Sequence, residues 1–224
     1  MTAAGPLDAE MRTTWYWSAM NDAVAIYGFE LPLVEEVSLK AASAAGRRYK
    51  EGEDLGEDTP TRLWVRKGRE SEGKRRLPHA FKAGDYVILS SKAADVLGGF
   101  DLGAARLSPI QLLKHDHATP FEGDWLLCTP ANLKKGFDPD HTSPDACISY
   151  NDPNWPVFGT LCSGHAVDDE IALRPSVLSG PDIWLDPSIG WGGLFVSGVL
   201  ADALRRHRVV GKTKLARCRL VTIH

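Results

Sequence analysis

The chain has 224 residues, 43% of them hydrophobic and 25% charged, and its formal net charge at pH 7 is -3. This length and composition allow a sizeable core in one large domain or in two small ones. Binding to nucleic acid through its phosphates requires a concentrated excess of Lys and Arg. The charge balance therefore disfavours nucleic-acid binding as the main function.

The N-terminal sequence MTAAGPLDAEMRTT has no basic segment followed by an apolar run. No later stretch approaches the roughly 18 to 20 apolar residues that span a bilayer. We therefore expect a cytoplasmic protein that does not act at a membrane.

The first part of the chain contains two apolar runs, TTWYWSAM and YGFELPLVEEVSL, whose aromatic and β-branched residues predict short strands. A short helix is the alternative over residues 22–26. From Lys40 the composition changes to small, charged and Gly residues, which predicts a long loop. Within this loop the sequence TRLWV predicts one further strand.

The charged part of this loop, residues 46–76, combines an acidic cluster with the basic stretch RKGRESEGKRR. Either the opposite charges neutralise each other on a solvated surface, or they form a binding surface. The acidic cluster has five carboxylates: Glu51, Glu53, Asp54, Glu57 and Asp58. We assign residues 1–78 to a strand-rich N-terminal segment and residues 79–224 to an α+β region; the two pack as separate units or as a single domain.

One sequence pattern occurs twice, at residues 86–113 and 193–221. YVILSSKAADVL aligns with GLFVSGVLADAL at a fixed offset that matches Ser90 with Ser197. Each copy predicts an apolar strand, a Ser that caps a short helix, and a second strand. The second strands, ARLSPIQLL and TKLARCRLV, align with one residue inserted after the helix. Convergence on a common strand-to-helix turn is the alternative to an internal duplication.

Between the two copies, EGDWLLCTP, ACISY, EIALRP and DIWLDP predict short strands bounded by Gly, Pro, Asp or Asn. Together with the repeated units, they predict an α+β fold with mixed or antiparallel sheets and a few short helices.

The cysteines show no spacing typical of a zinc knuckle or a redox motif, so we expect four reduced thiols: Cys128, Cys147, Cys162 and Cys218. In KLARCRLVTI, Cys218 alternates with Arg217 and Arg219. This alternation predicts that its sulfur lies on the inner face of a strand.

Few residues suggest catalysis, because the sequence contains neither a Gly-rich phosphate loop nor a nucleophile elbow. In CSGH, His165 could activate Cys162 as a nucleophile, but a packed thiol beside a surface His is the simpler interpretation. KHDH and DPDH could supply metal ligands or be solvated loop residues: His115, Asp116, His117, Asp138, Asp140 and His141. We expect no catalytic residue, metal or cofactor.

The C-terminal sequence PDIWLDPSIGWGGLFVSGVLADALRRHRVVGKTKLARCRLV resembles the closing segment of the immunity proteins of family eleven in the polymorphic-toxin classification. The features shared are an Ile-Trp-acidic turn, an apolar strand entering a Ser, a short helix with a Leu stripe and a last strand: Ile183, Trp184, Asp186, Phe195, Ser197, Leu200, Leu204 and Leu220. YVILSSKAADVLGGF looks like the upstream strand-helix unit of that family, whereas residues 46–76 match nothing in its pattern.

The resemblance implies a protein that binds one cognate bacterial toxin, encoded by a neighbouring gene, and blocks it stoichiometrically without being an enzyme. We infer that the acidic cluster suits a basic toxin such as a nuclease, whose cleft must attract phosphate. Trp184 and Trp191 are further candidate anchors, with a core position as the alternative for Trp184. An adaptor or self-assembling module, and a metal- or cysteine-dependent enzyme, remain as alternative functions.

Overall fold

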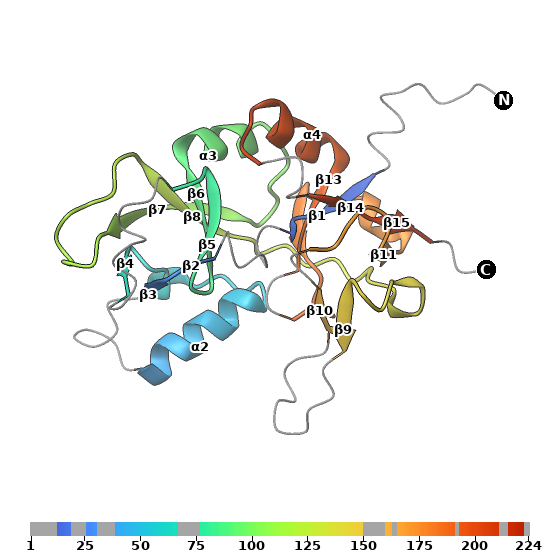
Figure 1. The fold of residues 1–224 in the computed structure, drawn as a ribbon, viewed down its shortest axis with the longest axis horizontal. Helices are drawn as coiled ribbons and strands as arrows, with labels where there is room; N and C mark the ends of the chain where they lie inside the picture. The colour runs from blue at the N-terminus through green and yellow to red at the C-terminus, as the bar shows by residue number, and fades with distance from the viewer. Residues whose placement is uncertain are drawn as a thin grey trace.

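The computed structural model describes residues 13–18, 26–30, 39–66, 77–149, 160–162, 165–190, 193–210 and 215–221. Its helices are α2 (Leu39–Lys50), α3 (Ser91–Leu97) and α4 (Gly198–Arg206), and its strands form two main sheets (Figure 1). The fold is α+β with mixed and antiparallel pairing, as the sequence predicts. Among the described helices, none has the length and hydropathy needed to cross a membrane.

The larger sheet has the strand order β2-β5-β6-β8-β7-β4-β3. Its members are β2 (Ile26–Tyr27), β5 (Ala80–Ala83), β6 (Tyr86–Ser90), β8 (Trp125–Thr129), β7 (Arg106–Leu113), β4 (Arg62–Val65) and β3 (Phe29–Glu30). The four strands from β5 to β7 pair antiparallel, whereas β4 runs parallel to β7. The strands predicted in TRLWV and EGDWLLCTP are thus confirmed as β4 and β8.

The smaller sheet has the order β12-β13-β1-β14. Its members are β12 (Ile183–Leu185), β13 (Leu194–Ser197), β1 (Thr14–Tyr16) and β14 (Ala216–Arg217). After one residue the chain of β14 continues as β15 (Arg219–Leu220), which pairs parallel with β11 (Ala172–Leu173). The N-terminal strand β1 therefore lies inside this sheet, between two strands from the C-terminal part of the chain.

The two sheets repeat one pairing pattern, in which β5-β6-β8-β7-β4 corresponds to β12-β13-β1-β14/β15-β11. The corresponding partners are Ser90 with Trp125 and Ser197 with Thr14; Pro109 with Leu126 and Arg217 with Trp15; and Gln111 with Arg62 and Arg219 with Ala172. The strand-helix parts of the two repeats align at one fixed offset, and their second strands align at an offset one residue larger. These two offsets also match the residue pairs in the two sheets. In the smaller sheet, β1 takes the place that β8 takes in the larger one.

Each repeat begins its helix at the predicted Ser. The hydroxyl oxygen of Ser90 accepts a hydrogen bond from the backbone N–H of Ala93, and that of Ser197 accepts one from Leu200, both at 3.3 Å. These bonds satisfy amides that the first helical turn leaves without a partner. Strand, Ser cap, helix and second strand are therefore confirmed in both copies.

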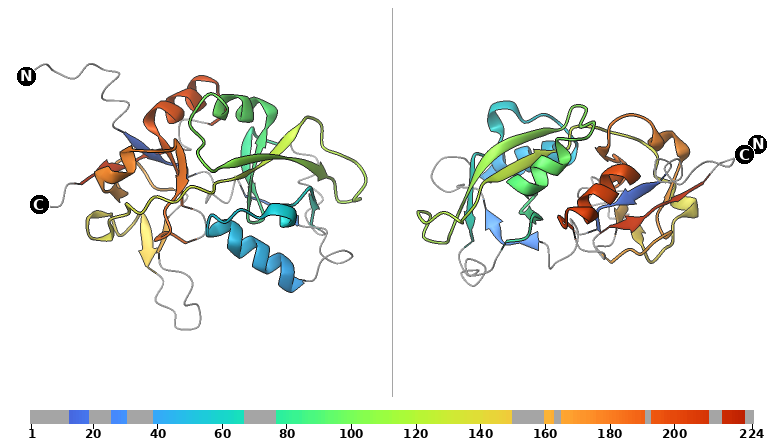
Figure 2. Two further views of the ribbon diagram at one scale, coloured as in Figure 1. Left: turned by 180° about the vertical axis from the view of Figure 1, so that it is seen from behind. Right: turned by 90° about the horizontal axis from the view of Figure 1, so that it is seen from above.

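The helices of the two repeats pack side by side and share one hydrophobic core (Figure 2, right). This core combines Val87, Leu89, Ala93 and Leu97 with Val196, Leu200, Ala201 and Leu204. A single core between the two sheets explains why neither helix needs more than one apolar stripe. The opposite face of each sheet packs against a further, separate core.

Helix α2 occupies residues for which the sequence predicts a loop, so that prediction is wrong for residues 40–50. The small residues of AASAA that suggested a loop include Ala, which favours helix. Ala45 and Tyr49, four residues apart, are both buried. The helix is therefore amphipathic, and Tyr49 belongs to the core on this face of the larger sheet.

The hydroxyl group of Tyr49 joins α2 to the two central strands of the larger sheet. It donates to the carbonyl oxygen of Cys128 at 2.5 Å and accepts from the N–H of Val87 at 2.9 Å. We expect Tyr49→Phe to lower the free energy of unfolding by about 2 kcal/mol, because two buried backbone groups lose a partner. Urea unfolding measures this loss.

Tyr86→Phe is the matched control for that substitution. The hydroxyl of Tyr86 is buried nearby, and the Tyr49 and Tyr86 rings are 4.9 Å apart, but this hydroxyl has no hydrogen-bond partner in the described structure. Its removal should leave the free energy of unfolding unchanged or raise it. Equal losses for the two variants would contradict the role assigned to Tyr49.

A short hairpin of β9 (Cys147–Ser149) and β10 (Thr160–Cys162) carries a disulfide between Cys147 and Cys162. The expectation of four reduced thiols is therefore wrong for this pair, whereas Cys128 and Cys218 are free and buried. The antiparallel register places Cys162 directly opposite Cys147. Their spacing of 15 residues gives no such indication in the sequence.

Candidate partner-binding surface

The cysteines occupy structural positions. Cys162 has no free thiol, and its carbonyl oxygen accepts a hydrogen bond from the hydroxyl of Tyr16 at 3.2 Å. Burial raises the pKa of the Cys128 thiol to about 12 and also raises that of Cys218. A buried neutral thiol is a poor nucleophile, which argues against a catalytic role for Cys128 or Cys218. With its sulfur in the disulfide, Cys162 cannot be the thiolate of a Cys162–His165 pair in this structure.

The KHDH segment forms a turn that its own residues stabilise. The carboxylate of Asp116 accepts hydrogen bonds from the hydroxyl and N–H of Thr119 and from the N–H of Ala118, which lowers its pKa to about 2. The His117 ring stacks on Trp64 with centroids 4.1 Å apart, and its backbone is left-handed (φ 57°). His115 is exposed in the same turn.

The DPDH segment forms a short 3-10 turn capped by Asp138. This buried carboxylate accepts from the backbone N–H of His141 and contacts its ring Nδ1 at 2.9 Å, and the contact with the His141 side chain lowers the pKa of Asp138. Asp140 is exposed. Within the part of the chain that the structure describes, no three His, Cys, Asp or Glu side chains are grouped as metal ligands.

The acidic turn of the immunity-like segment also has a structural role. Asp186 is buried, and its carboxylate accepts hydrogen bonds from the N–H groups of Gly136 and Phe137, both at 2.7 Å, and of Ser188 at 2.9 Å. It thereby ties the chain after β12 to the segment that follows β8.

Neither of the two tryptophans proposed as anchors is seen on the surface of the described residues. Trp184 is only 1% exposed and stacks on Phe195 with centroids 6.0 Å apart, while the Lys134 ammonium lies 3.9 Å from its ring centre. This is the core position that the sequence left open. Trp191 lies outside the described residues.

The acidic cluster begins after the last turn of α2 and is held in place by Arg48. Its guanidinium contacts Glu53 at 2.9 Å and Asp58 at 2.6 Å, and also donates to the carbonyl oxygen of Asp54. Asp54 in turn pairs with Arg106 of β7 at 3.1 Å. Ordinary surface ion pairs stabilise little individually, but this group fixes the course of residues 51–58.

Glu51 and Glu57 differ from the other three carboxylates. Both are exposed, and neither forms an ion pair with any described residue. Among the described residues, Arg48 and Arg106 neutralise part of the cluster. The sequence suggests the basic stretch from Arg66 to Arg76 as a further source of positive charge. Residues 67–76 of that stretch lie outside the described residues.

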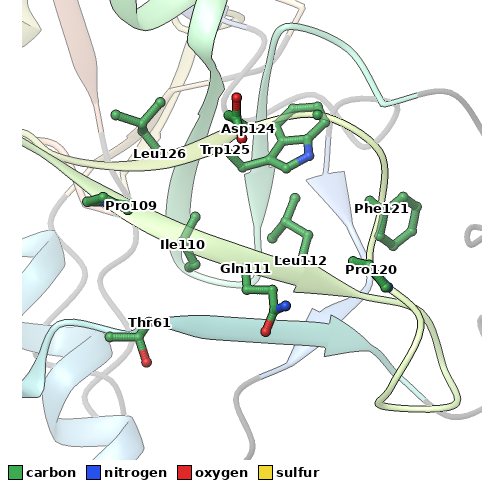
Figure 3. A pocket seen from close by; sticks show the side chains of 11 residues that line it. Thr61, Pro109, Ile110, Gln111, Leu112, Pro120, Phe121, Asp124, Trp125 and Leu126 are labelled. Atoms are coloured by element: carbon green, nitrogen blue, oxygen red, sulfur yellow. The ribbon is translucent and has the colours of Figure 1, made fainter.

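A groove with a cavity volume of about 660 Å³ runs along β7 (Figure 3). It is lined by Thr61, Pro109, Ile110, Gln111, Leu112, Pro120, Phe121, Gly123, Asp124, Trp125 and Leu126. The cluster and the groove are neighbours along the chain at two places: Asp58 lies three residues before Thr61, and Arg106, which pairs with Asp54, lies three residues before Pro109.

Proline in β7 helps to explain why the groove is there. The N–H of Gln111 donates to the carbonyl oxygen of Thr61, so it points toward β4. Successive backbone N–H groups of a strand point to opposite sides, so residues 109 and 111 point the same way. The nitrogen of Pro109 therefore also faces the β4 side, but it has no proton to donate. The pairing of β4 with β7 begins only at Arg62 and Gln111. The part of β7 that precedes Gln111 is therefore not covered by β4.

Two aromatic side chains of the groove pack against buried aromatic rings beneath them. Trp125 packs edge-on against the fully buried Phe81, and Phe121 contacts Phe29, with ring centroids 5.7 and 5.6 Å apart. The indole N–H of Trp125 donates to the carbonyl oxygen of Glu122. These rings are therefore held in one orientation, which lowers the entropic cost of binding a partner.

No motif or repeat in the sequence predicted this groove. The run ATPFEGDW places Phe121 and Trp125 in a Pro- and Gly-bounded segment, and β7 carries Pro109 within a strand. Aromatic residues in a loop and a proline in a strand are the features that could have indicated it.

No protein-family model matches the chain, and no curated protein matches it.

Proposed function

We propose that the protein is an immunity protein, which binds one cognate bacterial toxin and neutralises it by covering its active surface. The main support is the surface on which the acidic cluster, fixed by Arg48, adjoins an apolar groove with supported aromatic rings. The resemblance of residues 181–221 to family eleven of the immunity proteins supplies the class of partner. The proposed meeting place is the cytoplasm.

A blocking protein needs a stable fold and a complementary surface. Stable complexes bury roughly 1,200–2,000 Å² in total, and a few aromatic or Arg side chains supply most of the affinity. Opposite charge increases the rate of encounter. A basic toxin such as a nuclease would be attracted by the exposed carboxylates, while aromatic rings such as Trp125 would supply apolar contact.

The direct test uses the toxic domain encoded beside this chain's gene. The purified chain should form a one-to-one complex with that domain, abolish its activity and rescue cells that express it. If no complex forms, or if the isolated chain itself turns over a substrate, the proposed function is wrong.

The contribution of charge is best tested at Glu51 and Glu57, because neither carboxylate supports the fold. We expect the double variant Glu51→Gln/Glu57→Gln to associate with the toxic domain about three- to tenfold more slowly at low salt, with a weaker dependence on salt. Stopped-flow fluorescence at two ionic strengths measures both effects.

Asp95→Asn/Asp140→Asn is the matched control, since it removes two exposed carboxylates elsewhere on the surface. The control should leave the association rate nearly unchanged. Equal rates for the wild type and both double variants would exclude the acidic cluster from the encounter. Replacing Glu53 or Asp58 is less informative, because it would also break the contacts of Arg48.

A further inference from the structure

We propose that the β7 groove is the docking site for a segment of the toxin that carries apolar side chains flanked by Lys or Arg. The proposal rests on the proposed function and names the surface and the chemistry of the segment that binds there. Neither the repeat nor the immunity resemblance identifies this surface.

The shape of the groove favours an extended polypeptide. Pro109, Gln111, Pro120 and Asp124 in its lining are exposed, whereas Trp125 is half-buried. A small apolar ligand normally buries most of its surface in an enclosing pocket. An open groove along a strand instead accommodates successive side chains of a segment that crosses it.

The charges around the groove favour a basic segment. Of the described residues that line it, Asp124 alone is charged, and Glu122 is exposed two residues before it. At the other end lies the acidic cluster, which Asp54 joins to β7 through Arg106. Carboxylates at both ends attract Lys and Arg and repel the phosphates of a nucleic acid.

The supported rings provide the apolar part of the match. Trp125 and Phe121 lie along one side of the groove, with Gln111 and Thr61 on the side of β4 (Figure 3). Because Phe81 and Phe29 hold these rings from behind, little ordering is needed when a partner binds. Aromatic residues in such settings often dominate binding energy.

The first experiment presents the full chain with a phage-displayed library of random 12-residue peptides. We expect enriched peptides with net positive charge and at least one large apolar residue. A synthetic peptide with the enriched sequence should bind Gln111→Arg about tenfold more weakly, because the variant places bulk and positive charge in the groove. Fluorescence anisotropy measures the affinity.

Ser176→Arg is the matched control: it adds the same charge at an exposed position in the turn after β11, and its affinity for the peptide should stay within about twofold of the wild type. Asp124→Asn tests the charge contribution separately and should weaken the salt dependence. The proposal is overturned by peptides that bind Gln111→Arg as well as the wild type, by enrichment of acidic peptides, or by no enrichment.

The same variants separate this proposal from the proposed function. If the neighbouring toxic domain binds the wild type and Gln111→Arg equally well, the groove is not the docking site and the immunity function stands. If that domain fails to bind the wild type at all, the immunity function is wrong, whatever the peptides show.

Discussion

Deletion of residues 1–20 is expected to abolish cooperative folding. β1 is an interior strand of the smaller sheet, paired with β13 on one side and β14 on the other. Tyr16 and Trp17 have no exposed surface, and truncating a buried aromatic side chain alone costs about 3–5 kcal/mol. Because whole domains are stable by only about 5–15 kcal/mol, loss of the strand should exceed the available stability.

A circular permutant should restore folding with the same residues. In the larger sheet β8 follows β7 directly, and β1 holds the equivalent place beside β14. The permutant begins at Asn21 and carries residues 1–20 after His224, so β1 follows β15 along the chain. We expect an unfolding free energy within about 2 kcal/mol of the natural chain, since permutation at compatible positions is generally tolerated.

The deletion variant and the permutant share the same first residue and differ only in whether residues 1–20, which contain β1, are present. Circular dichroism and urea unfolding compare the two. A deletion variant that unfolds cooperatively would show that β1 is dispensable. A permutant as unfolded as the deletion variant would show that the match between β1 and β8 does not extend to chain connectivity.

The features that the sequence predicted correctly are local ones. Ser90 and Ser197 each accept a bond from an amide three residues ahead, so short-range chemistry decides where both helices begin. Cys218 lies inward between exposed Arg217 and Arg219, as the alternation in its strand indicates. Such rules need no knowledge of distant parts of the chain.

The features that the sequence did not reveal depend on pairing over long distances. The place of β1 beside β13, and of Cys147 opposite Cys162, follows from register that no local pattern encodes. The helical state of residues 39–50 depends on Tyr49 reaching Val87 and Cys128 in the larger sheet. Tertiary contacts of this kind override a composition that suggests a loop.

In the candidate surface, too, the sequence predicts the local features but not those that depend on contacts between distant residues. The acidic cluster was visible in the sequence, but the roles of its members were not, because Arg48 and Arg106 engage only Glu53, Asp54 and Asp58. The groove arises where β7 extends past the start of β4. Sequence alone places neither strand beside the other.

Loss of the disulfide is expected to lower the free energy of unfolding by about 3 kcal/mol, the chain-entropy value for a loop of 15 residues. Cys162 is only 2% exposed, so Cys147→Ala/Cys162→Ala is preferred over serine, which would bury a hydroxyl. The wild type should lose similar stability on reduction. The double variant should not respond to reductant, and a response would attribute the effect to another part of the molecule.

The number of free thiols shows whether the Cys147–Cys162 disulfide is formed in cells, and so in which compartment the protein acts. Unfolded but unreduced protein should react at two thiols, Cys128 and Cys218, and at four after reduction. Because reducing compartments keep disulfides rare, the number of free thiols in cells, counted by quenching the cells with acid and alkylating the chain in denaturant, discriminates between locations. Four reactive thiols in cells would support the cytoplasm proposed from the sequence, and the bond would then form only outside it. Two would show that the chain meets its partner in an oxidising compartment, where this hairpin is closed.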